Sequence, residues 1–175
     1  MRAIKNKIKR TSIFQKYLFI KGVGVPLFIV NWVFQHILRI DASGYNKCFT
    51  SRLIAADKVT IKNNCPEVKK SIAVSGGCYI QATHGVEIGM NTIWSFNVTM
   101  VTSDHDLNDF RLENTEKSGP ISIGDNCWLG SGVVILPNII LGPKTIVGAN
   151  SVVTKSFVSG NVVIAGCPAK IIREL

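Results

Sequence analysis

The polar segment at residues 101–122, VTSDHDLNDFRLENTEKSGPIS, concentrates the residue types that could perform chemistry. It contains His105 between Asp104 and Asp106, together with further acids, one arginine and several loop-forming residues. Imidazole titrates near neutral pH, so proton transfer is the chemistry that this segment could support. It also interrupts a regular pattern that runs on either side of it, and such polar excursions commonly carry function.

The pattern on either side is an aliphatic residue at every sixth position. Downstream, the series comprises Ile123, Leu129, Ile135, Leu141, Val147 and Val153, and glycine directly follows four of the six. Four residues after each of the first five comes a small or modest side chain: Cys127, Val133, Ile139, Thr145 and Ser151. Upstream, Ile88, Trp94 and Met100 occupy the first position, and Val74, Ile80 and Val86 fall more faintly at the fourth position after it. The step from Met100 to Ile123 is not a multiple of six, so the polar segment breaks the repeat.

A six-residue period fits neither an α-helix nor an array of hairpins. It predicts a coil of three short strands, each followed by a turn, in which the aliphatic positions point inward and successive coils pair as parallel strands. We expect the glycines to supply positive φ in the turns, and Asn138 and Asn150 to adopt the left-handed conformation in the same role. The flat faces and uncovered ends of such a coil predict oligomerisation.

The composition of the 175-residue chain fits a single folded domain, because 46% of its residues are hydrophobic and 18% are charged. The net charge of +9 belongs to the N-terminal part: residues 1–40 hold eight of the 20 basic residues and no acid, and the rest is nearly neutral. Nucleic acid is therefore not a predicted partner. Five scattered cysteines without metal-type spacing predict buried thiols in a reduced, cytoplasmic protein.

Residues 1–50 are expected to form a basic and apolar arm that is helical. Its uncharged stretch at residues 22–38, GVGVPLFIVNWVFQHIL, is short for a transmembrane helix, and the signal for a cleaved leader is weak. Two alternatives remain open. The arm packs against the main domain or a neighbouring subunit, or residues 1–40 lie on an anionic membrane surface as a peripheral anchor.

Three stretches resemble a known family: SDHD at 103–106, PISIGDNCWLGSGVVILPNIILGPKTIVGANSVVTKS at 120–156 and AGCPAKIIREL at 165–175. They are similar to the hexapeptide-repeat acetyltransferases, especially the sugar O- and N-acetyltransferases of surface polysaccharide type and of maltose or galactoside type. The resemblance covers residues 72–175. Its motifs identify the family with high specificity, but they do not identify which sugar is the substrate. Cys167 and Met90 depart from the family pattern, at positions where asparagine and aspartate are usual.

The resemblance implies a role for His105 as the general base, which takes a proton from a sugar hydroxyl or amine as it attacks the thioester of acetyl-CoA. Asp104, Asp106 or a backbone carbonyl would hold the ring in one tautomer. The acceptor would be contacted by Trp128, Asn97 and, from an adjacent subunit, His84. Each has a structural alternative, as a packing residue for Trp128 and as a turn residue for the other two.

The family pattern also assigns the contacts to acetyl-CoA, which would be a co-substrate with no metal required. They are Ser131 and the Gly148-Ala149 backbone, Thr154 and Lys155, and two cations for the phosphates, Lys170 and Arg173. The alternative for Lys170 and Arg173 is a solvated C-terminal tail.

The predicted organisation is therefore an all-β, left-handed parallel β-helix over residues 51–175, with a catalytic loop at about 101–120 and a short C-terminal tail. Residues 1–50 form the arm. The resemblance implies a homotrimer with active sites between subunits. Two other functions are considered on the same scaffold. A zinc-dependent hydrolyase of carbonic-anhydrase type would need three histidines, but the chain has only His36, His84 and His105. A non-catalytic β-helix scaffold is the other.

Overall fold

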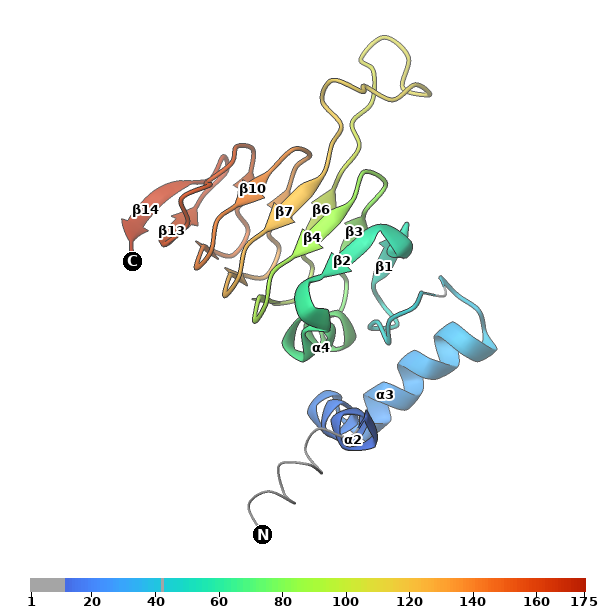
Figure 1. Cartoon of the computed structure of the whole chain (residues 1–175). Helices are drawn as coiled ribbons and strands as arrows, with labels where there is room; N and C mark the ends of the chain where they lie inside the picture. The colour runs from blue at the N-terminus through green and yellow to red at the C-terminus, as the bar shows by residue number, and fades with distance from the viewer. Residues whose placement is uncertain (1–11, 42) are drawn as a thin grey trace.

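The computed structural model describes residues 12–41 and 43–175, so the basic residues from Arg2 to Arg10 lie outside the described part. Its main body is a stack of coils whose short strands form three sheets (Figure 1). The first sheet contains β1 (Arg52–Ile54), β3 (Tyr79–Gln81), β6 (Thr99–Val101), β9 (Val134–Ile135) and β12 (Val152–Val153). The second contains β2 (Val59–Ile61), β4 (Val86–Ile88), β7 (Ile121–Ile123) and β10 (Ile140–Leu141). The third contains β5 (Ile93–Trp94), β8 (Trp128–Leu129), β11 (Ile146–Val147), β13 (Val162–Ala165) and β14 (Lys170–Glu174).

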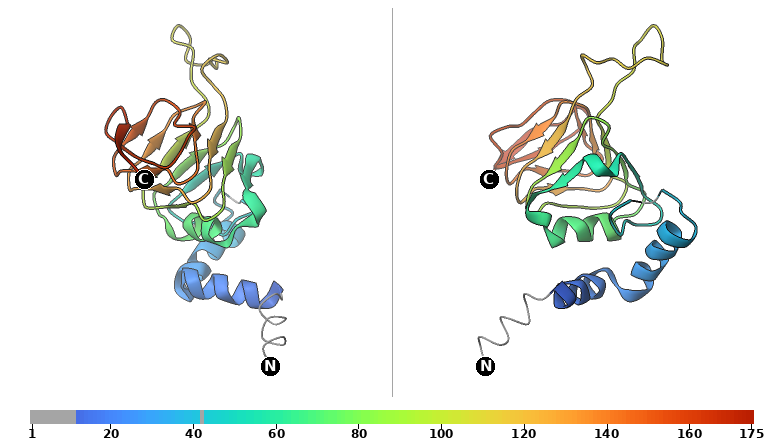
Figure 2. Two further views of the ribbon diagram at one scale, coloured as in Figure 1. Left: turned by 60° about the vertical axis from the view of Figure 1, so that its left-hand side comes forward. Right: turned by 45° about the vertical axis from the view of Figure 1, so that its right-hand side comes forward.

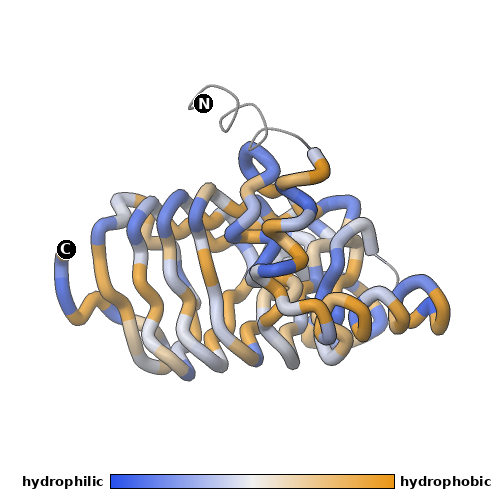
Figure 3. Tube along the Cα trace, turned by 90° about the horizontal axis from the view of Figure 1, so that it is seen from below, coloured by the Kyte–Doolittle hydropathy of each residue, from blue (hydrophilic) through white to orange (hydrophobic). Residues whose placement is uncertain are grey.

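The chain visits the three sheets in rotation, and all strand pairs are parallel except β13 with β14. This architecture confirms the predicted parallel coil of six-residue repeats. The inward series from Ile123 to Val153 is at most 2% exposed, and its members align in register with the coils before and after them. The alternation of hydrophobic and hydrophilic positions recurs from coil to coil (Figure 3).

The upstream phase of the repeat needs two corrections. Val74 is the last residue of a helix, Pro66–Val74, and belongs to no strand. Ile80 pairs with Met100, so it occupies the first position of its repeat and not the fourth position after it. The reason is that the inward residues of β3 and β4, Ile80 and Ile88, are eight positions apart and not six, which shifts the phase of the repeat without changing the strand pairing.

The role predicted for the glycines is wrong, whereas the role predicted for the asparagines is confirmed. Asn138 and Asn150 have φ of 63° and 56°, but none of the four glycines after inward aliphatics has positive φ. These glycines are required by close stacking of the coils. A Cβ on Gly142 would lie 2.2 Å from the carbonyl oxygen of Val158, and one on Gly124 would lie 2.7 Å from the nitrogen of Pro143.

A helix replaces a strand in the first coil, which the all-β prediction for residues 51–175 did not include. Helix α4 (Pro66–Val74) follows β2 and takes the place of a strand of the third sheet, where it packs against β5. Its buried residues Val68, Ile72 and Ala73 join the core of the coil. Two short 3-10 turns, η2 (Ala56–Lys58) and η3 (Lys62–Asn64), flank β2. At the other end, the predicted tail is the strand β14, antiparallel to β13.

The arm lies beyond the first coil and contains two helices (Figure 2). Helix α2 (Ser12–Val23) is followed at Gly24, with φ of 92°, by α3 (Val25–Trp32), which continues into the π-helical turn η1 (Val33–Ile37). Among the described residues, no single helix is long and apolar enough to cross a bilayer; α2 and the α3–η1 helix satisfy the length and composition test only as a pair bent by 100°. The end of the arm, after these helices, is anchored by Lys47, which is 2% exposed and pairs with Asp41 at 3.4 Å.

Candidate active site

The loop at residues 102–120 leaves the stack between β6 and β7 and projects away from the coils (Figure 1). Its first residues are clamped to the previous coil. The side-chain oxygen of Gln81 accepts hydrogen bonds from the backbone N–H groups of Thr102 and Ser103, at 3.0 and 3.1 Å. The hydroxyl of Thr102 donates to the carbonyl of Gln81 at 2.9 Å and accepts from the N–H of His84 at 3.0 Å. The loop therefore leaves the coil in one direction.

His105 is exposed on this loop, and its backbone forms an antiparallel bridge with Glu113 on the returning strand of the loop. Within the described residues its ring has no hydrogen bond or ion pair, so the imidazole is free to meet a substrate. The N–H of His105 donates to the Asp104 carboxylate at 2.8 Å, and the N–H of Asp104 donates to the Ser118 hydroxyl at 2.8 Å. The backbone, not the side chain, of the histidine is fixed here.

The two acids beside His105 shape the loop. Asp106 accepts from the N–H groups of Asn108 and Asp109, at 2.7 and 3.2 Å, and these bonds lower the pKa of its carboxyl. In the single chain both Asp104 and Asp106 bind backbone groups and neither bonds to the His105 ring. Their predicted role in selecting the tautomer of the ring stays a prediction.

His84 connects the loop to the coil from the turn between β3 and β4. Its Nε2 lies 2.5 Å from a carboxylate oxygen of Glu113. This hydrogen bond is the main reason why the pKa of Glu113 is lowered. Sequence reasoning missed Glu113, Gln81, Thr102 and Ser118 as loop-positioning residues, because only the folded loop brings them together. The engaged ring of His84 agrees with its structural alternative as a turn residue.

Trp128 and Ser131 mark a different part of the stack. Trp128 is 52% exposed on the third sheet, where its neighbours in register are Ile93 and Ile146. At the corner that follows, the hydroxyl of Ser131 donates to that of Ser95 at 2.7 Å. Asn97 adopts positive φ of 59° in the same corner of the preceding coil, as a turn residue would.

Most of the predicted residues thus lie at two edges of the first sheet, whereas Trp128 lies on the third sheet. At its carboxyl edge, where the chain passes to the second sheet, lie the loop residues, His84, Thr154 and Lys155. At its amino edge, where the chain arrives from the third sheet, lie Asn97, Ser131, Gly148 and Ala149. Lys170 and Arg173 are exposed on β14 at the end of the third sheet. The structure does not gather all of these residues at one place within one chain.

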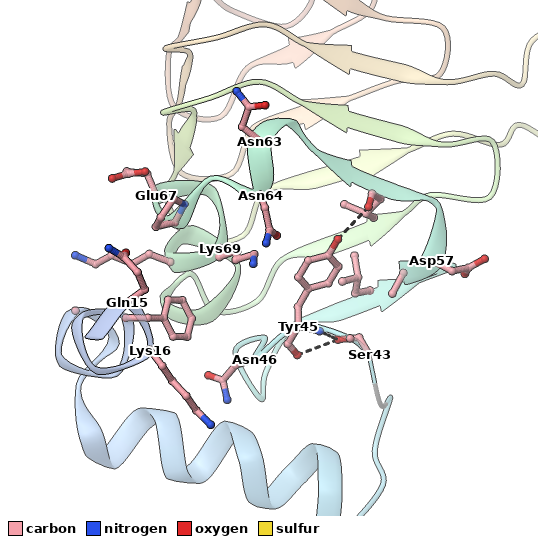
Figure 4. A pocket seen from close by; sticks show the side chains of 18 of the residues that line it. Gln15, Lys16, Ser43, Tyr45, Asn46, Asp57, Asn63, Asn64, Glu67 and Lys69 are labelled. Atoms are coloured by element: carbon pink, nitrogen blue, oxygen red, sulfur yellow. Dashed lines mark hydrogen bonds between the residues drawn. The ribbon is translucent and has the colours of Figure 1, made fainter. Parts of the chain in front are cut away.

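A cleft of about 1630 Å³ lies elsewhere, between α2 and the first coil (Figure 4). Lys16, Tyr45, Asn46, Asn64 and Lys69 are among the residues that line it, and none of the predicted site residues does. It is therefore separate from the loop that carries His105.

The remaining nucleophiles and metal-binding residues do not form a second centre. Burial raises the pKa of the Cys78 and Cys127 thiols, which disfavours their reactive thiolate forms. His36 lies in the arm, with its ring stacked on Trp32 at 5.2 Å, far along the chain from the loop. Over residues 12–41 and 43–175, no three His, Cys, Asp or Glu side chains gather as a metal site, and a zinc hydrolyase is not supported.

Comparison with known proteins locates the match in the repeats. Residues 120–155 match the family described as bacterial transferase hexapeptide (six repeats). The galactoside O-acetyltransferase of Escherichia coli (strain K12) is 43% identical over 91 residues, which are 51% of this chain and 44% of that protein. The chain spans about half the length of the curated relatives it matches. The matched region covers 44% of the galactoside O-acetyltransferase and 53% of a putative acetyltransferase of Staphylococcus aureus (strain MRSA252).

Solved structures give the same result. A maltose O-acetyltransferase from Clostridium difficile 630 superposes with a TM-score of 0.50 at 37% identity, over 56% of this chain and 52% of that one. A hexapeptide-repeat acetyltransferase, VCA0836 from Vibrio cholerae, superposes with a TM-score of 0.51 at 25% identity, over 73% and 64%. Residues 120–155 thus carry the hexapeptide repeats of bacterial transferases, and the resemblance of this chain to the hexapeptide-repeat acetyltransferases is confirmed.

Proposed function

We propose that this protein transfers an acetyl group from acetyl-CoA to a hydroxyl or amine of a sugar, in the biosynthesis of a surface polysaccharide or another glycan. The observation that carries the proposal is the exposed imidazole of His105, which has no partner among residues 12–41 and 43–175, on a loop anchored to the coils. The named relatives, which acetylate galactosides or maltose, support a sugar as the acceptor.

In the proposed reaction, an imidazole nitrogen of His105 accepts the proton of the acceptor as the oxygen or nitrogen attacks the thioester carbonyl carbon. The tetrahedral intermediate then collapses and the carbon–sulfur bond breaks. The sulfur of CoA leaves with the electron pair and takes up the proton from the imidazolium. No covalent acyl-enzyme is needed, which agrees with the burial of Cys78 and Cys127.

The proposed site lies between subunits of a homotrimer. The loop with His105 and the corner with Ser131, Gly148 and Ala149 are at opposite edges of the first sheet in one chain. A cyclic assembly would bring the loop of one subunit to the other edge of its neighbour, and closed cyclic symmetry is the usual outcome for identical chains. The left-handed sense of the coil, which the family resemblance implies, belongs to the same proposal.

For acetyl-CoA we retain the predicted contacts. Lys170 and Arg173 are exposed and form no ion pair within the described part of the chain. The ammonium group of Lys170 and the guanidinium group of Arg173 are therefore available to bind the phosphates of CoA. Ser131, Gly148, Ala149, Thr154 and Lys155 would lie along the rest of the molecule. Trp128 and Asn97 would contact the acceptor.

The location proposed is cytoplasmic, where acetyl-CoA is available and thiols stay reduced; all five cysteines are free thiols in the structure. We also propose peripheral contact of residues 1–40 with the inner face of the cell membrane. Such contact would bring the enzyme to a lipid-linked sugar acceptor.

The proposal is tested by following thiol release from acetyl-CoA with a panel of free sugars, sugar nucleotides and amino sugars. We expect turnover with at least one acceptor and a loss of about 10²- to 10⁴-fold in kcat for His105→Ala. His36→Ala is the matched control, since His36 lies in the arm and should leave kcat unchanged. Full activity of His105→Ala would exclude the proposed base. A wild type that turns over no acceptor in the panel would instead favour the scaffold alternative.

A further inference from the structure

Helix α3 has its polar side toward the protein and its apolar side outward. Asn31 is fully buried and Gln35 is 2% exposed. The amide of Asn31 donates to the carbonyl of Ala73 at 3.0 Å and accepts from the N–H of Phe49 at 2.9 Å. The amide of Gln35 donates to the carbonyl of Lys47 at 2.9 Å. The inner face of the helix is thus held by hydrogen bonds to the first coil and the segment leading to it.

The outer face carries large apolar side chains at helical spacing. Val25, Ile29 and Trp32 are 55%, 52% and 44% exposed, and their separations of four and three residues place them on one side of the helix. A helix on the surface of a water-soluble protein normally has the opposite arrangement. Contiguous exposed apolar area of this kind marks a contact with another protein or with a membrane.

Helix α2 also exposes large apolar side chains. Ile13 and Tyr17 are 83% and 56% exposed on that helix, and neither lines the cleft between α2 and the first coil. Both helices lie at one end of the molecule, below the coils and far from the loop of residues 102–120 (Figures 1 and 2). We call the exposed side chains Ile13, Tyr17, Val25, Ile29 and Trp32 the arm surface.

Charge favours a lipid bilayer over a second protein as the partner of this surface. Residues 1–40 contain eight basic residues and no acid, although the rest of the chain is nearly neutral. Lys21 and Arg39 are exposed and form no ion pair within the described residues. Basic residues near an anionic membrane surface are attracted to its negative surface potential. Two amphiphilic aromatics, Tyr17 and Trp32, are of the type enriched at the membrane interface.

The geometry fits a helix pair that lies on the membrane and does not cross it. A spanning helix needs about 20 residues. The bend of 100° between the two helices breaks the only stretch of sufficient length among the described residues. We infer that the arm surface docks on an anionic lipid bilayer, with Val25, Ile29 and Trp32 inserted among the headgroups and the upper acyl chains. This inference specifies the membrane contact proposed above and does not depend on the acetyl transfer.

The test is flotation of the full-length protein with liposomes of phosphatidylcholine alone or with 30% phosphatidylserine (roughly the anionic content of an inner leaflet), near physiological salt. We expect recovery with the anionic liposomes only, a blue shift of tryptophan fluorescence that Trp32→Phe removes, and about a tenfold loss of recovery for the double variant Ile29→Glu/Trp32→Glu. Val158→Glu is the matched control, since Val158 is 63% exposed but lies at the far end of the stack and should float like the wild type.

Three outcomes would overturn the inference: no flotation of the wild type, equal flotation of the double variant, or a lower oligomeric mass of the double variant in light scattering without liposome binding by the wild type. The last would assign the arm surface to contacts between copies of this chain. The thermal unfolding midpoint reports whether the double variant is folded. If it is not, Ile29→Ser, which adds no charge, tests the same surface. Thiol release from acetyl-CoA with a soluble sugar is measured in the same samples, so failure of membrane binding is distinguished from failure of the proposed reaction.

Discussion

The coils and the loop of residues 102–120 are held in place by different kinds of interaction. In the coils, each inward side chain contacts equivalent side chains above and below it, and each turn repeats the same backbone geometry. The loop is fixed by a few individual hydrogen bonds at its base and by the pair of His84 and Glu113. The repeats therefore provide most of the stability in this comparison, and the proposed chemistry takes place on the loop, which adds fewer stabilising contacts.

The largest effect in this comparison is expected from a truncation inside the coil. Leu129→Ala should lower the free energy of unfolding by about 2–5 kcal/mol, because Leu129 is fully buried in the third sheet. Trp128→Ala, its neighbour in sequence, points outward and should cost far less stability while reducing proposed acceptor binding. Denaturant unfolding of both variants measures the difference. Equal destabilisation would contradict the assigned register.

Gly142→Ala should destabilise by about 1–3 kcal/mol, because the added Cβ would lie 2.2 Å from the carbonyl oxygen of Val158 and the coils would have to separate. Gly44→Ala is the control, since a Cβ there would have no atom within 4 Å. A fall in the melting temperature for Gly142→Ala alone would support the stacking role of these glycines, and the same fall in both variants would refute it.

In the loop, Gln81→Ala removes the acceptor for two backbone N–H groups at the base. We expect about a tenfold loss in kcat/KM, because the loop no longer leaves the coil in one direction, with a loss of stability of about 1 kcal/mol. Gln81→Glu retains an acceptor oxygen and should recover most of the activity. Failure of this rescue, with folding intact, would mean that the clamp does not position His105.

The smallest effect concerns the pair of His84 and Glu113. The pKa of Glu113 is lowered from its ordinary value of about 4.5. The hydrogen bond to His84 therefore stabilises the loop fully at pH above 4.5, and this stabilisation is lost as the pH falls through the lowered pKa. Amide hydrogen exchange at residues 103–118 should therefore accelerate at acidic pH in the wild type beyond its intrinsic pH dependence. Glu113→Gln should remove that extra dependence. An unchanged profile in the variant would assign the effect to other groups of the loop.

The sequence predicted the coils well because their periodicity is local and repeats many times. The inward positions from Ile123 to Val153 and the left-handed asparagines follow from spacing alone. The glycines could not be interpreted correctly from one coil, since the atoms that exclude a Cβ belong to the next coil. Helix α4 was missed although Pro66 and Glu67 form an N-terminal helix signature, because the helix is short and interrupts the repeat.

The site was less predictable than the fold. Family resemblance directed attention to His105, but the contacts that hold its loop join Gln81, His84, Glu113 and Ser118, which share no spacing rule. The division of the predicted residues between two edges of one sheet was equally invisible, because it depends on which corner of the coil each residue occupies.

The corner that carries the loop tolerates extra residues without altering the strands around it. The inward residues Ile80 and Ile88 are eight positions apart across this corner, whereas Ile135 and Leu141 are six apart. Residues 102–120 are inserted at the same corner one coil later, yet β4 still pairs with β7 and β6 with β9 in unbroken alignment. Changes of chain length at this corner are thus uncoupled from the folding of the stack. Loops from enzymes of the same architecture could be transplanted here, which makes this corner a natural place to engineer the acceptor preference of the proposed reaction.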